Sequence, residues 1–211
     1  MRRFNIAGPC NNKQHYMIAA ASRLQGVEKL IDAEQYFVIH AARQSGKTTY
    51  IQDLARRLNT EGKYYALYCS LESVQNIIDP KEGIPAIVKM LKEMLEFNIP
   101  HSFEFAKDAD YDNFTGVLRL SLSRFCMTLD KPLVILFDEA DCLSNGTLIT
   151  FLRQLRDGYN NRSNRAFVHS IVLVGMRNIR DYKAQIRPDS ESLGSASPFN
   201  IVTKSLTLSN F

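Results

Sequence analysis

Apolar and polar positions alternate along this chain in blocks that predict short strands separated by helices. Five short runs are rich in β-branched or aromatic side chains: residues 36–40, 64–69, 133–137, 171–175 and, more weakly, 204–208. The third and fourth runs are almost wholly apolar, which is typical of strands buried on both faces of a parallel sheet. The pattern therefore favours a sheet whose central strands are covered on both sides.

Between these strands, apolar residues recur at helical spacing. One set follows the first strand, and Gly62 is expected to end that helix. A second helix is expected to open at Pro85, a third to occupy residues 114–125, and a fourth to start near residue 148 and end at Gly158. Strands that alternate with helices imply right-handed βαβ units, so the predicted fold class is α/β with a doubly wound parallel sheet.

Several segments fall outside this pattern. Residues 1–35 are expected to form an N-terminal arm and a helix from about Met17, and residues 36–211 the core domain. Residues 157–165 (DGYNNRSNR) predict a polar, basic loop, and residues 187–198 are rich in Ser, Gly and Pro. Because the chain stops directly after a strand-like run, we expect it to be a fragment of a longer protein.

Charge, hydropathy and cysteine content limit the cellular location and the kinds of binding site that are expected. The formal net charge of the 211 residues is +4, which is too mild to argue for nucleic acid by itself. No apolar run approaches the length needed to cross a bilayer, and no apolar stretch follows the first residues, so a cytoplasmic location is expected. The four cysteines and four histidines are scattered. They predict free thiols and no metal site built from protein side chains alone.

A phosphate loop is the strongest chemical signal. The string AARQSGKT at residues 41–48 matches G-x-x-x-x-G-K-[ST], except that Ala41 replaces the first glycine. Backbone N–H groups at a helix N-terminus attract phosphate oxygens, Gly46 lets the chain curl around them, and Lys47 brings a mobile charge to the β- and γ-phosphates. A chance Gly-Lys-Thr is the alternative, against which the strand–loop–helix context argues. The candidate nucleotide-binding residues are Ala42, Arg43, Gln44, Ser45, Gly46, Lys47, Thr48 and Thr49, and the Thr48 hydroxyl is also a candidate Mg²⁺ ligand.

Two carboxylates end the third strand. Asp138 and Glu139 follow the apolar run 133–137, at the edge of a parallel sheet where ligands bind. Asp138 is the candidate Mg²⁺ ligand, and Glu139 is the candidate general base that takes a proton from the attacking water. The alternative is an acidic N-cap for the next helix, which would explain one carboxylate but not its pairing with a phosphate loop.

The second carboxylate also distinguishes among classes of phosphate-loop protein. GTPases usually lack it and use Asn-Lys-x-Asp to read the base. The nearest string here, Asn12–His15, lacks the Asp and precedes the phosphate loop. A strand ending in Asp-Glu is not the usual mark of small-molecule kinases either. ATP hydrolysis therefore fits the motifs best.

The fourth strand is followed by two candidates for a phosphate sensor. Arg177 and Asn178 come just after Gly175, and the end of that strand is expected to lie beside the γ-phosphate. A cation there would stabilise the charge that develops in the transition state, so Arg177 is a candidate catalytic residue. A surface arginine after a strand is an equally open interpretation.

These motifs resemble those of the AAA-like ATPases, in the additional-strand, catalytic-glutamate division of phosphate-loop proteins. Residues 37–49 look like the phosphate loop of prokaryotic AAA-like proteins and of the related STAND NTPases, and Gly175-Met176-Arg177 is similar to their arginine-type sensor. The resemblance implies a five-stranded sheet in the order 5-1-4-3-2, an arm near the adenine, and a C-terminal helical lid that is missing here. In AAA+ rings a neighbour supplies an arginine, for which Arg153, Arg156, Arg162 and Arg165 are candidates beside a solvated-loop interpretation.

Three hypotheses for function follow. The first is an ATPase, with ATP and Mg²⁺, that switches the conformation of an effector domain outside this chain or acts in a homo-oligomer. The second is a DNA-associated AAA+ module of the initiator or helicase-loader kind, for which nucleic-acid binding is weakly supported. The third is a scaffold that binds nucleotide without hydrolysing it, against which Lys47, Thr48, Asp138 and Glu139 argue.

Overall fold

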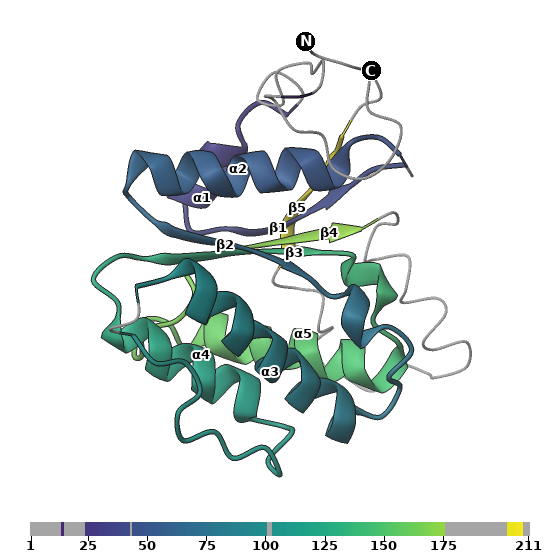
Figure 1. Cartoon of the computed structure of the whole chain (residues 1–211), viewed down its shortest axis with the longest axis vertical. Coiled ribbons are helices and arrows are strands. Elements are labelled where there is room, and N and C mark those ends of the chain that lie inside the picture. Colours follow the sequence, from purple (N-terminus) through teal and green to yellow (C-terminus); the bar gives the residue numbers. More distant parts are fainter. Residues whose placement is uncertain (1–13, 15–23, 43, 101–102, 176–201, 209–211) are drawn as a thin grey trace.

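In the computed structural model, a parallel sheet of five strands lies between two layers of helices (Figure 1). The structure describes residues 14, 24–42, 44–100, 103–175 and 202–208. The strand order is β2-β3-β4-β1-β5, and all four neighbouring pairs are parallel. This confirms the α/β class and the order 5-1-4-3-2.

The elements are α1 (Val27–Asp32), β1 (Tyr36–His40), α2 (Lys47–Glu61), β2 (Tyr65–Ser70), η2 (Glu72–Val74), α3 (Pro80–Asn98), α4 (Val117–Thr128), β3 (Leu133–Asp138), η3 (Ala140–Cys142), α5 (Asn145–Asn160), β4 (Ser170–Gly175) and β5 (Val202–Thr207).

Each face of the sheet carries its own core. Helices α1 and α2 cover one face, and α3, α4 and α5 cover the other (Figure 1). Strand β1 shows how alternation supplies both cores, because Tyr36 and Val38 belong to the core under α3–α5 while Phe37 and Ile39 belong to the core under α1 and α2. All six residues of β3 and all six of β4 are buried, which confirms the prediction that these runs lie inside the sheet.

Helix α3 begins earlier than the sequence pattern predicts. The expected start was Pro85, but the helix opens at Pro80 and contains Pro85. The Asp79 carboxylate accepts a hydrogen bond from the Lys81 backbone N–H at 2.9 Å and so caps the helix, while Pro80 occupies the first helical position, where no N–H is needed. A cap and a proline together outweigh the hydrogen bond that Pro85 removes.

Helix α5 ends later than predicted. It continues through Gly158 to Asn160, so the first residues of the expected polar loop are helical. Gly158 serves packing here, because a Cβ at this position would lie 2.2 Å from the ring of Phe167. Beyond the helix, the Arg162 guanidinium lies 4.1 Å from the centre of the Tyr159 ring and donates to the Glu34 carbonyl at 2.8 Å. Glu34 precedes β1, so Arg162 lies at the amino edge of the sheet.

The remaining predictions differ in small ways or lie outside the described residues. Helix α2 ends at Gly62, whose φ of 73° confirms the expected cap. Helix α1, which precedes β1, begins at Val27 after Gly26, and the predicted helix start near Met17 lies outside the described residues. The arm and residues 187–198 lie outside the described part of the chain.

Three cysteines are free thiols, as predicted, and burial raises the pKa of Cys69 to about 12. Within the described residues, no helix is both long and apolar enough to span a membrane.

Candidate nucleotide-binding site

The phosphate loop joins the end of β1 to the start of α2. Its first residue, Ala41, is buried and donates its backbone N–H to the Gly175 carbonyl at 3.2 Å, which ties the loop to the end of β4. Gln44 and Gly46 both have left-handed backbones, with φ of 58° and 75°. These two turns curl the chain so that α2 begins directly at Lys47. The N-terminus of a 15-residue helix thus faces the carboxyl edge of the sheet, where it attracts anions.

Lys47 connects this loop to the two carboxylates of β3. Its Nζ lies 3.2 Å from Oε1 of Glu139 and 4.0 Å from Oδ1 of Asp138, although these residues are about ninety positions away in the chain. The Lys47 side chain is only 9% exposed. A nearly buried ammonium group needs anionic partners, because its loss of hydration is otherwise uncompensated. The structure therefore brings together the three charged residues that the motifs predicted.

Asp138 is the most tightly held of them. It is the last residue of β3, and its side chain is 1% exposed. Its Oδ2 accepts hydrogen bonds from the Thr48 hydroxyl at 2.7 Å and from the Tyr68 hydroxyl at 3.3 Å, while its Oδ1 accepts from the Glu139 backbone N–H at 2.9 Å. Three donors fix the orientation of this carboxylate. The pair of Thr48 and Asp138 presents hard oxygen atoms, which are the ligands that Mg²⁺ prefers.

Glu139 projects from a sharp turn after the strand. Its φ of 53° places it in the left-handed region, which is uncommon for a residue with a side chain and concentrates at functional sites. Glu139 occupies the N-cap position of η3, but its side chain makes no capping hydrogen bond. The alternative interpretation of this carboxylate as an acidic helix cap is therefore wrong. The carboxylate instead reaches Lys47 and remains 35% exposed, which leaves it open to a water molecule.

The arrangement fits a nucleoside triphosphate with Mg²⁺. Ser45 is 4% exposed, and its hydroxyl has no hydrogen-bond partner among the described residues. A buried hydroxyl of this kind calls for an acceptor, and a phosphate oxygen at the helix N-terminus would supply one. Nowhere in the described part of the chain do three or more His, Cys, Asp or Glu gather as a metal site. Mg²⁺ bound with phosphates needs only one or two protein ligands, so Thr48 and Asp138 suffice.

The other predicted site residues divide into two groups. Ala42 and Gln44 are exposed on the loop, and Thr49 is half-buried in the first turn of α2. Arg43, Arg177 and Asn178 lie outside the described residues, so the roles predicted for them stay predictions. The β4 strand that precedes Arg177 does end between β3 and β1, as the strand order 5-1-4-3-2 requires.

Two residues at this edge were missed by the sequence reasoning. Asp141, in η3, lies against the end of β4, since a Cβ on Gly175 would come within 2.8 Å of its Oδ1. Tyr68 reaches Asp138 from the neighbouring strand β2, and burial, followed by the charge of Asp138, raises the pKa of its hydroxyl. Only the knowledge that β2 lies beside β3 would have singled out a tyrosine in this strand.

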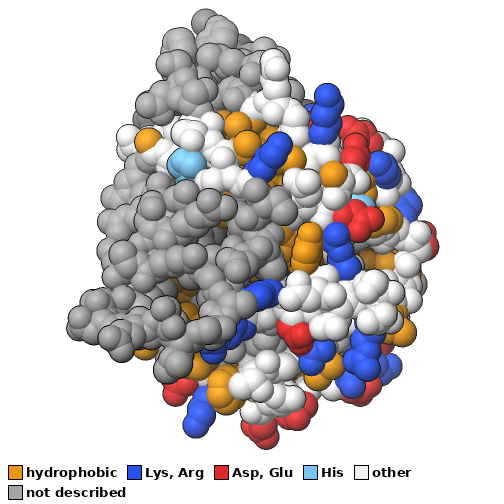
Figure 2. Space-filling model, turned by 180° about the vertical axis from the view of Figure 1, so that it is seen from behind, with side chains coloured by type: hydrophobic (Ala, Val, Ile, Leu, Met, Phe, Trp, Pro, Cys, Tyr) orange, Lys and Arg blue, Asp and Glu red, His pale blue; other side chains and the backbone are white. Residues whose placement is uncertain are grey.

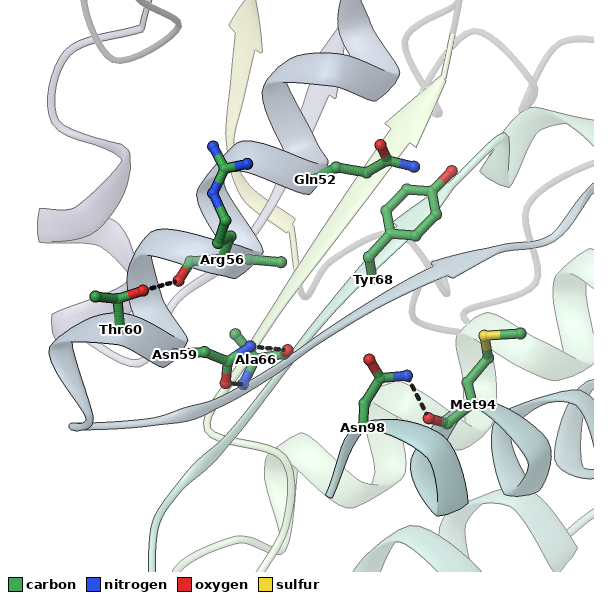
Figure 3. Close-up of a pocket in the computed structure, with 9 residues that line it drawn as sticks. Gln52, Arg56, Asn59, Thr60, Ala66, Tyr68, Met94 and Asn98 are labelled. Carbon is green, nitrogen blue, oxygen red and sulfur yellow. Dashed lines mark hydrogen bonds between the residues drawn. The ribbon is translucent and has the colours of Figure 1, made fainter. Parts of the chain in front are cut away.

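Tyr68 also borders a hollow of about 550 Å³ between α2 and the free edge of β2 (Figure 3). Asn59 lines this hollow, and its side-chain amide exchanges two hydrogen bonds with the backbone of Ala66, at 2.7 and 2.9 Å. In this way the side chain takes the place of a neighbouring strand at an otherwise open sheet edge. Gln52 points toward Tyr68 from α2 (Figure 3).

Several solved structures share this fold. A Walker-type ATPase of Pyrococcus abyssi has a TM-score of 0.60 at 12% sequence identity, over 97% of this chain and 56% of that chain. Drosophila ORC bound to poly(dA/dT) DNA and Cdc6 has a TM-score of 0.59 at 10% identity, over 90% and 29% of the two chains. Cdc6p from Pyrobaculum aerophilum has a TM-score of 0.55 at 16% identity, over 89% and 44%. At these identities the likeness shows the fold alone.

The present chain spans from 29% to 56% of the length of those three chains. A search of the curated proteins found no match. A family model described as an AAA domain matches residues 31–182, which include the phosphate loop and the two carboxylates after β3. This chain therefore belongs to the AAA domain family of P-loop ATPases.

Proposed function

We propose that this chain binds ATP with Mg²⁺ and hydrolyses it, and that the cycle switches the conformation of an effector domain outside residues 1–211. The observation that carries this proposal is the single contact set formed by Lys47, Thr48, Asp138 and Glu139. These residues come from the phosphate loop and from β3, and hydrolysis needs a phosphate-binding cation, a metal site and a base in one place.

Each residue has a defined task in this proposal. Lys47 binds the β- and γ-phosphates as a mobile point charge, and the backbone N–H groups at the start of α2 orient them. Thr48 and Asp138 would hold Mg²⁺, which would supply positive charge against the phosphate oxygens while the γ-phosphoryl group passes to water and ADP leaves. Glu139 orients the attacking water toward the γ-phosphorus and accepts a proton from that water.

The ion pair between Glu139 and Lys47 supports the assignment of the base. At 3.2 Å the Lys47 ammonium and the Glu139 carboxylate are close enough to bind one water molecule between them. In the proposed complex Lys47 binds the γ-phosphate, so the Glu139 carboxylate would lie close to the attacking water. Arg177, which follows β4 within three residues, is proposed to stabilise the charge on the same phosphate in the transition state.

The wider organisation is also part of the proposal. Residues 1–35 form an arm and helix that precede the ATPase core of residues 36–211, and the protein acts in the cytoplasm. The effector architecture is proposed to follow that of the STAND relatives, with a homo-oligomer as the other arrangement. In such an oligomer a neighbour would supply an arginine. Arg162 is a poor candidate, because it binds Glu34 of its own chain at the amino edge of the sheet.

Binding is tested by calorimetry on the full-length protein. Lys47→Ala should lose affinity for Mg·ATP by on the order of a hundredfold or more, since the pocket loses its mobile cation and charge-assisted hydrogen bonds. Lys63→Ala is the matched control, because Lys63 is an exposed lysine paired with Asp32 at the other edge of the sheet. Equal affinity of the Lys47 variant and the wild type would refute the phosphate-loop assignment.

A DNA-associated module is the second candidate. The observation in its favour is that the similar structures include ORC in complex with DNA and Cdc6, and this likeness is one of fold. On the face shown in Figure 2, lysine and arginine side chains lie among acidic ones in the described part of the chain. Titration of labelled duplex DNA with full-length protein at two salt concentrations tests this candidate. Binding that weakens steeply with salt would support it, and no binding at low salt would reject it.

A further inference from the structure

Tyr68 occupies a position that joins three elements of the site. It lies in β2, the strand beside β3, and its ring packs at the margin of the core under α2. Its hydroxyl donates a hydrogen bond to Oδ2 of Asp138 at 3.3 Å. Gln52, four residues after Thr48 on the same face of α2, points toward the tyrosine (Figure 3). The tyrosine therefore stands between helix α2 and the carboxylate that it contacts.

The hydrogen bonds of Asp138 show what the Tyr68 hydroxyl contributes to the orientation of the carboxylate. Oδ1 is fixed by one donor, the Glu139 backbone N–H. Oδ2 has two donors that approach from different elements, the Thr48 hydroxyl from α2 and the Tyr68 hydroxyl from β2. Without the tyrosine hydroxyl, Oδ2 would keep one donor, the Thr48 hydroxyl, beside the Glu139 N–H and the 4.0 Å ion pair of Lys47 at Oδ1, and the carboxylate could rotate about its Cβ–Cγ bond more freely.

We propose that Tyr68 is a positioning residue for Mg²⁺ binding, whose hydroxyl holds the Asp138 carboxylate in the orientation that the metal site requires. The inference rests on the proposed function, because Asp138 is the metal ligand in that proposal. Tyr68 touches neither ATP nor the metal in this scheme. It acts through Asp138.

The packing of the ring does not require a hydroxyl at this place. One side of Tyr68 lines the hollow next to α2, so phenylalanine fits the same volume without a clash (Figure 3). Among the described residues, the hydroxyl donates its hydrogen bond to the Asp138 carboxylate. A change that removes only this oxygen therefore separates hydrogen bonding from packing.

The test is Tyr68→Phe in the full-length protein, with ATP affinity measured by calorimetry in Mg²⁺ and again in EDTA. The ratio of the two affinities is the readout, since a merely structural role would lower both. We expect affinity in EDTA to stay within about twofold of the wild type. The ratio should fall about threefold to tenfold, the range for a long hydrogen bond to a charged group that supports a metal ligand.

Tyr65→Phe is the matched control. Tyr65 lies in the same strand, and its hydroxyl bonds Asp130 at 2.8 Å, away from the carboxyl edge of the sheet. The ratio for this variant should equal that of the wild type.

The outcomes separate this inference from the proposed function. If Tyr68→Phe keeps the wild-type ratio while Asp138→Asn loses it, the positioning role of Tyr68 is overturned and the metal assignment stands. If Asp138→Asn also keeps the ratio, the metal assignment itself is refuted. Equal losses for Tyr68→Phe in Mg²⁺ and in EDTA would show a distorted phosphate loop and would likewise overturn the positioning role.

Discussion

The two edges of the sheet carry charges in contrasting environments. At the carboxyl edge, the side chains of Lys47 and Asp138 are 9% and 1% exposed. At the amino edge, those of Lys63 and Asp32 are 60% and 52% exposed, although their ion pair is shorter. Exposed pairs cost little to form and contribute little, whereas buried charges are expensive to desolvate. A protein that keeps buried charges together at one edge does so for binding or chemistry, and the comparison therefore identifies the site without reference to any motif.

The largest effect on the Mg²⁺ dependence of ATP binding is expected at Asp138. Asp138→Asn keeps the shape of the side chain but removes the charge that Mg²⁺ needs, so the gain in ATP affinity due to Mg²⁺ should fall about tenfold or more. Calorimetry in Mg²⁺ and in EDTA measures this gain. Asp130→Asn is the control, because Asp130 accepts a hydrogen bond from Tyr65 on the exposed surface. A Mg²⁺ effect in Asp138→Asn as large as in the wild type would contradict the metal assignment.

The sequence predicted the charged residues of the site but not Tyr68 beside them, and the reason is physical. The sequence alone indicated Lys47, Thr48, Asp138 and Glu139, because each follows or precedes a short apolar run and the chemistry of each is specific. Tyr68 could not be found in this way. Its role depends on the hydroxyl reaching across from β2 to the neighbouring strand β3. The strand order that the family resemblance implies places these two strands side by side, but it does not indicate which side chain of β2 reaches Asp138.

The boundaries of the helices were also difficult to predict from the sequence alone. Pro85 and Gly158 are strong local signals for a helix start and a helix end, yet both lie inside helices. Tertiary or neighbouring contacts decide each case: the Asp79 cap begins α3 earlier, and the Phe167 ring packs where a larger side chain than glycine would clash. Strand positions were predicted to within about two residues because burial on both faces leaves an unambiguous apolar run.

A smaller effect is expected at the amino edge. Arg162→Ala removes a 3.7 Å ion pair with Glu34 and the contact with the Tyr159 ring. Because the pair is partly exposed, the free energy of unfolding should fall by less than about 1 kcal/mol, and ATP affinity should not change. Urea unfolding and calorimetry check the two statements. A loss of ATP affinity would mean that the two edges of the sheet are coupled and that the contrast between them is wrong.

The smallest effect concerns pH at the same edge. Burial, the largest cause, lowers the pKa of His169 below its ordinary value of 6.5, although the Glu34 charge opposes this and Lys63 and Arg162 support it. A depressed histidine pKa contributes stability that is present above pH 6.5 and is lost as the pH falls through the folded-state value. The free energy of unfolding should therefore drop between about pH 7 and pH 5, and His169→Gln should make this drop shallower. An identical pH profile for the variant would rule out His169 as the cause.

The central claim is that the carboxyl edge is a hydrolytic site with Glu139 as its base. Single-turnover ATP hydrolysis and nucleotide retention, measured side by side in the full-length protein, test it most directly. Glu139→Gln keeps the shape of the side chain but cannot take the proton, so it should retain ATP while hydrolysis slows by on the order of a hundredfold or more. Hydrolysis at the wild-type rate in this variant would contradict the account, and the edge would then bind nucleotide without supplying the catalytic base.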